Sequence, residues 1–254
     1  MFQQIEENPT VLKWLVFGQS GSGKTSLAKT WHDTKRVFFI DLENGSLSAR
    51  YKNGDNGERI KTKINVLKFD FKMVGDKKVR LDCTEKKQKF EEALKWAIAN
   101  LTKDDLLVID SLTELAQITH NCLKLKYPDK RDSMTLWGEF LSSMTAIASF
   151  IKDLPLNVLI TSLMTSELDA DKNIKEGIMV SGQAANLIPP LFDEVYKTKV
   201  ITKEDGSRVY ALVTQPDNSE PTKSRGGVLN RYEKPDLAAI RNKILGIKEK
   251  GENK

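Results

Sequence analysis

The sequence predicts an α/β fold whose mostly parallel central sheet is flanked by helices and followed by an antiparallel hairpin. Short apolar runs that end at glycine or polar residues indicate buried strands. Segments with apolar residues at helical spacing lie between these runs. The turn Glu204-Asp205-Gly206-Ser207 separates two further strand-like runs. Because buried parallel strands are joined by helical crossovers, this alternation favours a sheet covered on both faces.

The central strands are predicted from runs rich in β-branched and aromatic residues. The predicted strands span residues 11–17, 36–41, 106–110 and 157–163.

The helices are predicted where apolar residues recur every three or four positions. The segment 86–101 is a clear case, with Phe90, Leu94, Ala97 and Leu101 on one face. The other predicted helices span residues 26–32, 113–126, 137–154 and 235–247, with a short one before Pro189-Pro190.

Two hairpins are predicted from turn signals between extended runs. The first joins residues 64–73 to 77–82 through Val74-Gly75-Asp76, and the second joins residues 194–202 to 208–215. The polar segments 165–183 and 216–227 are predicted to be loops.

The domain organisation predicted is a short N-terminal segment at 1–10, a core at 11–234, and a C-terminal helix with a lysine-rich tail at 235–254. The 254 residues, 39% hydrophobic and 30% charged, suit a soluble globular protein. Without a signal-like apolar segment or a run of about 18 apolar residues, we expect a cytoplasmic location and no membrane contact. Cys83 and Cys122 are expected to be reduced thiols. The net charge of +5 is compatible with nucleic-acid binding but equally with a solvated lysine surface.

The most specific motif is a phosphate-binding loop, GQSGSGKT, at residues 18–25. Its glycines allow backbone N–H groups to face phosphate oxygens. Lys24 can reach the β- and γ-phosphates, and the Thr25 hydroxyl can bind Mg²⁺. The sequence therefore predicts ATP and Mg²⁺ as ligands, bound by Gly18, Gln19, Ser20, Gly21, Ser22, Gly23, Lys24, Thr25 and Ser26.

Two acidic residues follow predicted strands and are candidates to complete this site. Asp110 ends the run LLVID, where a carboxylate can hold Mg²⁺ beside the loop. Glu43 follows the run RVFFID, where a carboxylate can deprotonate the attacking water. From spacing alone, Glu43 could equally be an ordinary turn residue.

The ordered set VFGQSGSGKTS, FFIDLENGS, LLVIDSLTEL and NVLITSL resembles the RecA-like ATPases. The short length, LIPPLFDEV at 187–195 and the Lys-x-Arg at 223–225 resemble the phage-encoded, core-only members, which include the Sak-type single-strand annealing recombinases. The resemblance covers residues 11–229. It implies a RecA-like core in which Glu43 is the catalytic base and Lys24 also serves catalysis.

The resemblance also implies roles for less conspicuous residues. Thr161 or Ser162 would occupy the position of the γ-phosphate sensor, although the family often has a longer polar side chain there. Lys223 and Arg225 match the basic pair that a neighbouring subunit supplies to the phosphates. That role requires a homo-oligomer, either a ring or a filament, and few residues lie outside the core to form it.

Single-stranded DNA is the partner that the resemblance implies. The loops near residues 124–137 and 165–183 would face DNA, with a single-strand binding protein as a further partner. Basic side chains near an aromatic ring suit single strands. The candidate contacts are Lys124, Lys126, Tyr127, Lys130 and Arg131, and the hairpin turn with Lys72, Lys77, Lys78 and Arg80 is a second basic surface.

The function predicted is ATP binding and hydrolysis coupled to annealing or pairing of single strands in phage recombination or replication, in the cytoplasm of a bacterial host. One alternative is an ATP-dependent regulator of protein assembly without DNA binding. Another is a small-molecule kinase, which would need arginines clustered over the phosphates, whereas the arginines here are scattered.

Overall fold

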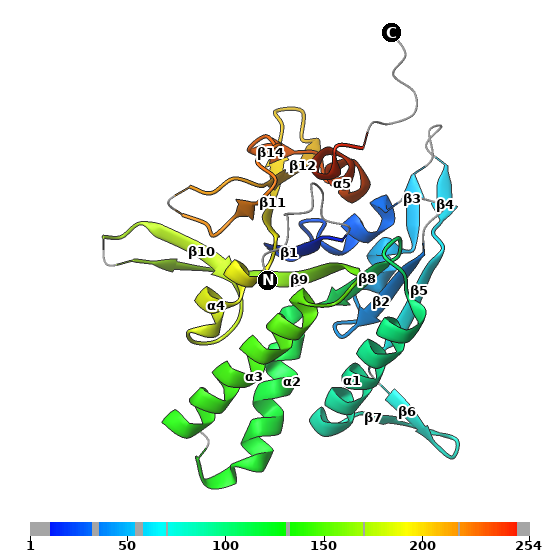
Figure 1. Ribbon diagram of the computed structural model, residues 1–254, viewed down its shortest axis with the longest axis vertical. Helices are drawn as coiled ribbons and strands as arrows, with labels where there is room; N and C mark the ends of the chain where they lie inside the picture. The colour runs from blue at the N-terminus through cyan, green and yellow to red at the C-terminus, as the bar shows by residue number, and fades with distance from the viewer. Residues whose placement is uncertain are drawn as a thin grey trace, which may run out of the picture.

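The computed structural model describes residues 11–31, 36–53, 58–69, 71–130, 133–169, 171–217 and 219–247. Its centre is a ten-stranded sheet with the main strand order β14-β12-β11-β1-β9-β8-β2-β5, flanked by helices (Figure 1). The predicted α/β fold with a mostly parallel sheet and antiparallel C-terminal strands is confirmed.

The parallel part of the sheet consists of strands with almost uniformly buried side chains. β1 lies between β9 and β11 and is parallel to both, and β2 lies between β8 and β5. All the loops at their C-terminal ends therefore meet at one edge of the sheet. These strands are β1 (Lys13–Gly18), β2 (Val37–Asp41), β5 (Ile64–Lys68), β8 (Leu106–Asp110), β9 (Asn157–Leu168) and β11 (Glu194–Thr202).

Helices cover both faces because side chains alternate along each strand. In β1, Leu15 and Phe17 face one core cluster, whereas Trp14 and Val16 face the other. The first cluster is closed by α1 (Cys83–Asn100), α2 (Leu112–Lys126), α3 (Met134–Lys152) and α4 (Ala184–Leu187). The second is closed by the 3₁₀ segment η1 (Thr25–Thr30) and by α5 (Leu237–Leu245).

Short elements complete the described chain. Antiparallel pairing to β11 and its neighbours comes from β12 (Arg208–Val213), β13 (Lys223–Ser224) and β14 (Tyr232–Glu233). The remaining elements are η2 (Ser46–Ala49), η3 (Pro128–Lys130), η4 (Pro189–Leu191), β3 (Tyr51–Asn53), β4 (Arg59–Lys61), β6 (Phe71–Val74), β7 (Lys77–Arg80) and β10 (Ile174–Ile178).

Four local predictions were wrong. The segment 216–227 is not wholly a loop, because β13 lies within it and pairs with β11. Residues 64–73 do not form one strand: β5 joins the main sheet, and only β6 pairs with β7 in the hairpin. The segment 165–183 is not wholly a loop, because β9 continues to Leu168 and pairs with β10. The segment after the phosphate loop is a 3₁₀ rather than an α-helix.

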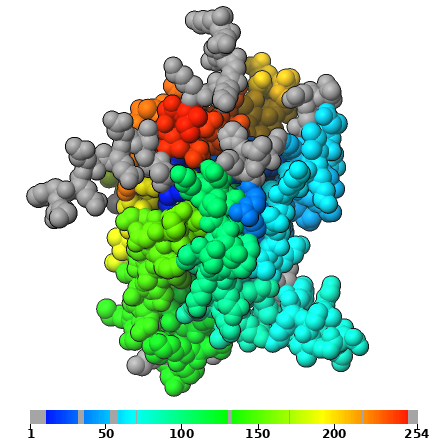
Figure 2. All heavy atoms as spheres, turned by 45° about the vertical axis from the view of Figure 1, so that its right-hand side comes forward, coloured from blue at the N-terminus to red at the C-terminus, as the bar shows by residue number. Residues whose placement is uncertain are grey.

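The β6–β7 hairpin stands out from the body of the molecule (Figure 2). Phe69, fully buried in the first core cluster, anchors its base. All eight residues of the two hairpin strands are exposed. Among the residues described, no helix has the length and apolar character needed to cross a membrane.

Candidate functional site

The phosphate-binding loop leaves β1 at Gly18 and ends at η1, as the motif predicts. Gly21 and Gly23 have φ angles of +73° and +94°, which side chains with a Cβ rarely adopt. The Lys24 ammonium donates to the Gly18 and Gln19 carbonyl oxygens at 2.9 and 2.8 Å. Lys24 is thus folded onto its own loop, and it must exchange these acceptors for phosphate oxygens to bind a nucleotide.

Strand β11 supports the loop from the side. The hydroxyls of Ser22 and Thr198 lie 2.6 Å apart, and Thr198 also donates to the Phe17 carbonyl oxygen at 3.3 Å. A Cβ atom on Gly18 would come 1.9 Å from Thr198 Oγ1. The first glycine of the motif is therefore required by close approach of β11. Sequence reasoning did not identify Thr198.

Asp110 and Thr25 are adjacent, as a shared Mg²⁺ site requires. The Thr25 hydroxyl donates to Asp110 Oδ2 at 2.9 Å, and Asp110 is nearly fully buried at the end of β8. A Cβ on Gly45 would come 3.0 Å from Asp110 Oδ2 and 3.8 Å from Thr25 Oγ1, so glycine keeps open the space beside both oxygens. A carboxylate and a hydroxyl beside an open space fit a hard divalent cation.

Glu43 is held next to this pair by the backbone. The amides of Leu42 and Glu43 both donate to the Asp110 carbonyl oxygen, at 2.7 and 3.2 Å. Asp41 caps the turn by accepting from the Gly45 and Ser46 amides at 2.9 and 3.2 Å. The Glu43 side chain is exposed and accepts from the Ser111 hydroxyl. The structure therefore brings Glu43 beside Asp110 at the predicted nucleotide site, and Asp41 is a positioning residue that the sequence did not reveal.

The charges of the site act on one another. Burial lowers the pKa of Lys24, and the negative charges of Asp110 and Glu43 oppose that shift. Burial raises the pKa of Asp110, hydrogen bonds from Thr161 and Thr25 lower it, and the negative charges of Glu43 and Asp41 raise it further. A cation beside Asp110 would favour its charged form, which burial disfavours.

The sensor candidates occupy different positions. Thr161 is buried in β9 and donates to Asp110 Oδ1, so it orients the carboxylate. The Ser162 hydroxyl lies 3.1 Å from that of Thr113 in α2 and donates to the Leu163 carbonyl oxygen at 2.9 Å. Of the two, only Thr161 hydrogen-bonds a residue of the predicted nucleotide site.

Lys223 and Arg225 lie away from the phosphate loop of their own chain. Lys223 donates to the Pro190 carbonyl oxygen at 3.0 Å, and Arg225 donates to Asp193 at 3.0 Å. β13 pairs with β11 at Glu194, which is level with Trp14 in β1. The loop starts four residues further on, about 13 Å along the strand. Their role at a neighbour's phosphates stays a prediction.

Among the predicted DNA contacts near residue 124, the lysines whose side chains are described are either paired or half-buried. Lys126 forms an ion pair with Glu139 at 3.6 Å and lies 4.8 Å from the centre of the Tyr127 ring. Lys124 is half-buried. The side chain of Lys130 and the whole of Arg131 lie outside the described residues.

A hollow of about 470 Å³ runs along the phosphate loop and η1, within the size range of small-molecule sites. Its walls include the loop from Gly21 to Thr25, and then Lys29, Thr30 and Pro235. Tyr210 of β12 forms another wall and lies against Gly23. Tyr210 was not identified from the sequence, because its position next to the loop depends on the pairing of β11 with β12.

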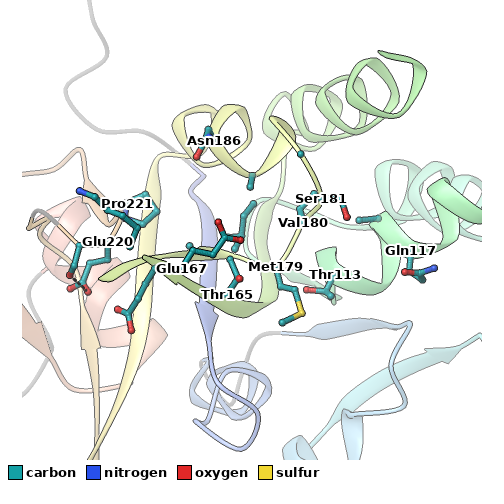
Figure 3. Close-up of a pocket in the computed structure, with 18 of the residues that line it drawn as sticks. Thr113, Gln117, Thr165, Glu167, Met179, Val180, Ser181, Asn186, Glu220 and Pro221 are labelled. Carbon is teal, nitrogen blue, oxygen red and sulfur yellow. Dashed lines mark hydrogen bonds between the residues drawn. The ribbon is translucent and has the colours of Figure 1, made fainter. Parts of the chain in front are cut away.

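A second hollow, of about 800 Å³, lies between α2, α4 and the β9–β10 hairpin. In Figure 3, Thr113 and Gln117 line one side, Glu220 and Pro221 the other, and Thr165 with Glu167 lie between them. Its wall contains the acidic residues Glu167, Glu176, Asp217 and Glu220, together with Lys175 and His120. Glu176 and Glu220 form ion pairs with Lys197, and Asp217 forms one with Arg231. The segment 165–183 contributes much of this wall, and its predicted contact with DNA stays a prediction.

Comparisons with known proteins give one family. A family model described as "AAA domain" (AAA_24) matches residues 10–226. No curated protein matches the chain.

Among the solved structures similar to the chain are two ATPases of type III secretion systems. The ATPase EscN from enteropathogenic E. coli is 16% identical, with a TM-score of 0.45, over 75% of this chain and 43% of that chain. A prototypical ATPase from the type III secretion system of pathogenic bacteria is 16% identical, with a TM-score of 0.42, over 74% and 51%. The chain thus spans about half the length of these proteins or less.

Proposed function

The chain belongs to the AAA domain family whose model covers residues 10–226, and on that premise we propose that it binds and hydrolyses ATP with Glu43 as the base. The convergence of Lys24, Thr25, Asp110 and Glu43 at one sheet edge supports the proposal most directly. ATP would lie along the loop, with Lys24 turned from its own carbonyl oxygens toward the phosphates.

Thr25 and Asp110 would hold Mg²⁺, which when bound neutralises charge on the β- and γ-phosphate oxygens. Ser111 donates to Glu43 and so orients its carboxylate. Glu43 accepts a proton from water while that oxygen bonds to the γ-phosphorus. The bond from phosphorus to the bridging oxygen breaks, giving ADP and phosphate.

The proposal is tested by measuring ATP binding and phosphate release on separate variants. Glu43→Gln should reduce hydrolysis about 10²–10⁴-fold, because only the base is lost, while ATP binding is retained. Lys24→Ala should lose binding. Glu91→Gln, which changes an exposed glutamate of α1, is the control and should match the wild type. Unchanged hydrolysis in Glu43→Gln would refute the assignment, and transfer of phosphate to a small acceptor instead of water would indicate a kinase.

For the partner, we propose single-stranded DNA bound at the β6–β7 hairpin. Lys77, Lys78 and Arg80 are exposed there, and Arg80 lies 6.0 Å from the centre of the exposed Phe71 ring. Cations beside an accessible ring suit phosphates and unpaired bases. The resemblance to phage-encoded recombinases is the reason to place this contact in strand annealing or pairing.

A labelled oligothymidine titrated at several salt concentrations tests the DNA proposal, with and without ATP. Lys77→Ala with Lys78→Ala should weaken binding and lower the salt slope by roughly 1.4, because two phosphate contacts are lost. The matched control is Lys199→Ala with Lys203→Ala on the exposed part of the β11–β12 hairpin. If the protein binds no DNA at low salt, either with or without ATP, the alternative function of an ATP-dependent regulator of protein assembly would be favoured.

A further inference from the structure

We propose that the ring of Tyr210 is the surface on which the purine base of the nucleotide stacks. The inference rests on the proposed binding of a nucleoside triphosphate at the loop. It assigns the nucleoside end of the site, which none of the predicted residues addresses.

The position of Tyr210 follows from the strand register. β12 pairs with β11 so that Leu212 lies opposite Thr198, and Leu212 is buried in the second core cluster. Tyr210 is two residues from Leu212 and therefore on the same face. That face also carries Thr198, which contacts Ser22 of the phosphate loop. The Tyr210 side chain therefore lies on the same face as the buried Leu212, but just outside the core and next to the phosphate loop.

The ring is both accessible and close to the loop. Tyr210 is 39% exposed, which is unusual for a large side chain on a core-facing position. Its Cδ1 and Cε1 atoms would lie 3.4 and 3.9 Å from a Cβ on Gly23. A Cβ at position 23 would thus be in ordinary van der Waals contact with the ring, which places the ring edge directly beside the loop.

The hollow extends away from the γ-phosphate end of the site, and this direction indicates where the base would lie. Glu43 and Asp110 define the γ-phosphate end, and neither contributes to the wall of the 470 Å³ hollow. From Lys24 and Thr25 the hollow continues past Tyr210 to Thr30 and Pro235. A nucleotide whose phosphates lie on the loop would extend its nucleoside in this direction. Aromatic rings stack on bases.

The described side chains at this end provide little to distinguish one purine from another. Thr30 donates to the Leu27 carbonyl oxygen at 2.7 Å and accepts from the Leu237 amide at 2.8 Å. Ser48 donates to the Gly45 carbonyl oxygen at 3.1 Å. Lys29 can only donate, and both adenine and guanine have an N7 acceptor. We therefore expect GTP to bind in the same way as ATP and to depend on Tyr210 to the same extent.

The test compares ligands with and without a base. Equilibrium binding of adenylyl imidodiphosphate, its guanylyl counterpart and inorganic tripolyphosphate is measured on wild type, Tyr210→Ala and Tyr210→Phe. Tyr210→Ala should weaken both nucleotides about tenfold, because the stacking surface is lost, and leave tripolyphosphate unchanged. Tyr210→Phe keeps the ring and should match the wild type for all three ligands.

Each other outcome has a definite meaning. Equal weakening of all three ligands would mean that Tyr210 only supports the loop, and unchanged nucleotide affinity in Tyr210→Ala would mean that the base lies elsewhere; both overturn the proposal. Lys24→Ala is measured in parallel. If Lys24→Ala also binds nucleotides normally, the proposed function fails rather than the stacking role alone.

Discussion

At the scale of single residues, Glu194 makes the stability of the folded state depend on pH. It is buried and accepts hydrogen bonds from the Tyr196 hydroxyl at 2.6 Å and from the Arg225 amide at 3.1 Å. Burial raises the pKa of Glu194, and these hydrogen bonds only partly oppose the shift. The folded state therefore favours the protonated acid. This contribution to stability is complete below the ordinary pKa of about 4.3 and is lost as pH rises through the raised value.

Glu194→Gln should consequently be more stable than the wild type at pH 8, because no charge is buried. The difference in free energy of unfolding should shrink as pH falls toward 4.5. Urea denaturation at a series of pH values measures it, and Glu91→Gln serves as the exposed control with a difference that stays constant. A Glu194→Gln difference that does not vary with pH would contradict the assignment.

Residue types in a motif were predictable, but their partners were not. Lys24, Thr25, Asp110 and Glu43 were named because their chemistry is tied to positions next to a glycine loop or at strand ends. Thr198 and Tyr210 come to the loop from about 180 residues away through the pairing of β1 with β11 and of β11 with β12. Asp41 was hidden because a capping aspartate and a metal-binding aspartate look alike in sequence.

At the scale of elements, the contact between the loop and β11 leaves less space for a side chain at Gly18 than at Gly21 or Gly23. Gly18→Ala would bring a methyl group 1.9 Å from Thr198 Oγ1 and 3.2 Å from Thr198 Cβ. Since Thr198 is fixed in a strand, the loop or β11 must shift. We expect a loss of about 1–3 kcal/mol in stability together with weaker ATP binding.

Denaturant unfolding and equilibrium ATP binding measure this effect. Gly177→Ala in β10 is the matched control, since nothing lies within 4 Å of the added Cβ, and it should leave both properties unchanged. Normal ATP binding by Gly18→Ala would show that β11 yields easily and that the contact is unimportant.

Elements with one dominant pattern were predicted well. The four central strands and the long helices α1, α2 and α3 appear within a few residues of the expected positions. The errors arose where a strand pairs with a distant partner. β5 was predicted to be part of the hairpin, because its pairing with β2 cannot be recognised from the local sequence. The polar half of β9 was read as a loop because its partner β10 is polar too.

At the scale of the whole molecule, the position of Arg225 bears on assembly. It lies on the opposite end of β1 from the phosphate loop, so it cannot serve its own nucleotide without a large rearrangement. If it serves a neighbour's, Arg225→Ala should lower hydrolysis while ATP binding persists. The same holds for Lys223.

A mixing experiment distinguishes action of Arg225 at the nucleotide of its own subunit from action at the nucleotide of a neighbouring subunit. Glu43→Gln lacks the base but retains Arg225, and Arg225→Ala is the reverse. In mixed assemblies, an Arg225→Ala site beside a Glu43→Gln subunit has both groups, so phosphate release should exceed the sum of the separate proteins. The size of the protein with ATP, with ADP and with single-stranded DNA is measured on the same samples. No gain in a protein shown to assemble would contradict action in trans.

The position of β1 between β9 and β11 also has a consequence for the order of folding. The phosphate loop is synthesised well before its supports, because the strands on either side of β1 lie about 145 and 180 residues later in the chain. Contacts between such distant segments form slowly. On the ribosome, the loop therefore emerges long before it can be held in a phosphate-binding shape. We therefore expect ATP to stabilise the chain only after β11 has been added to the sheet.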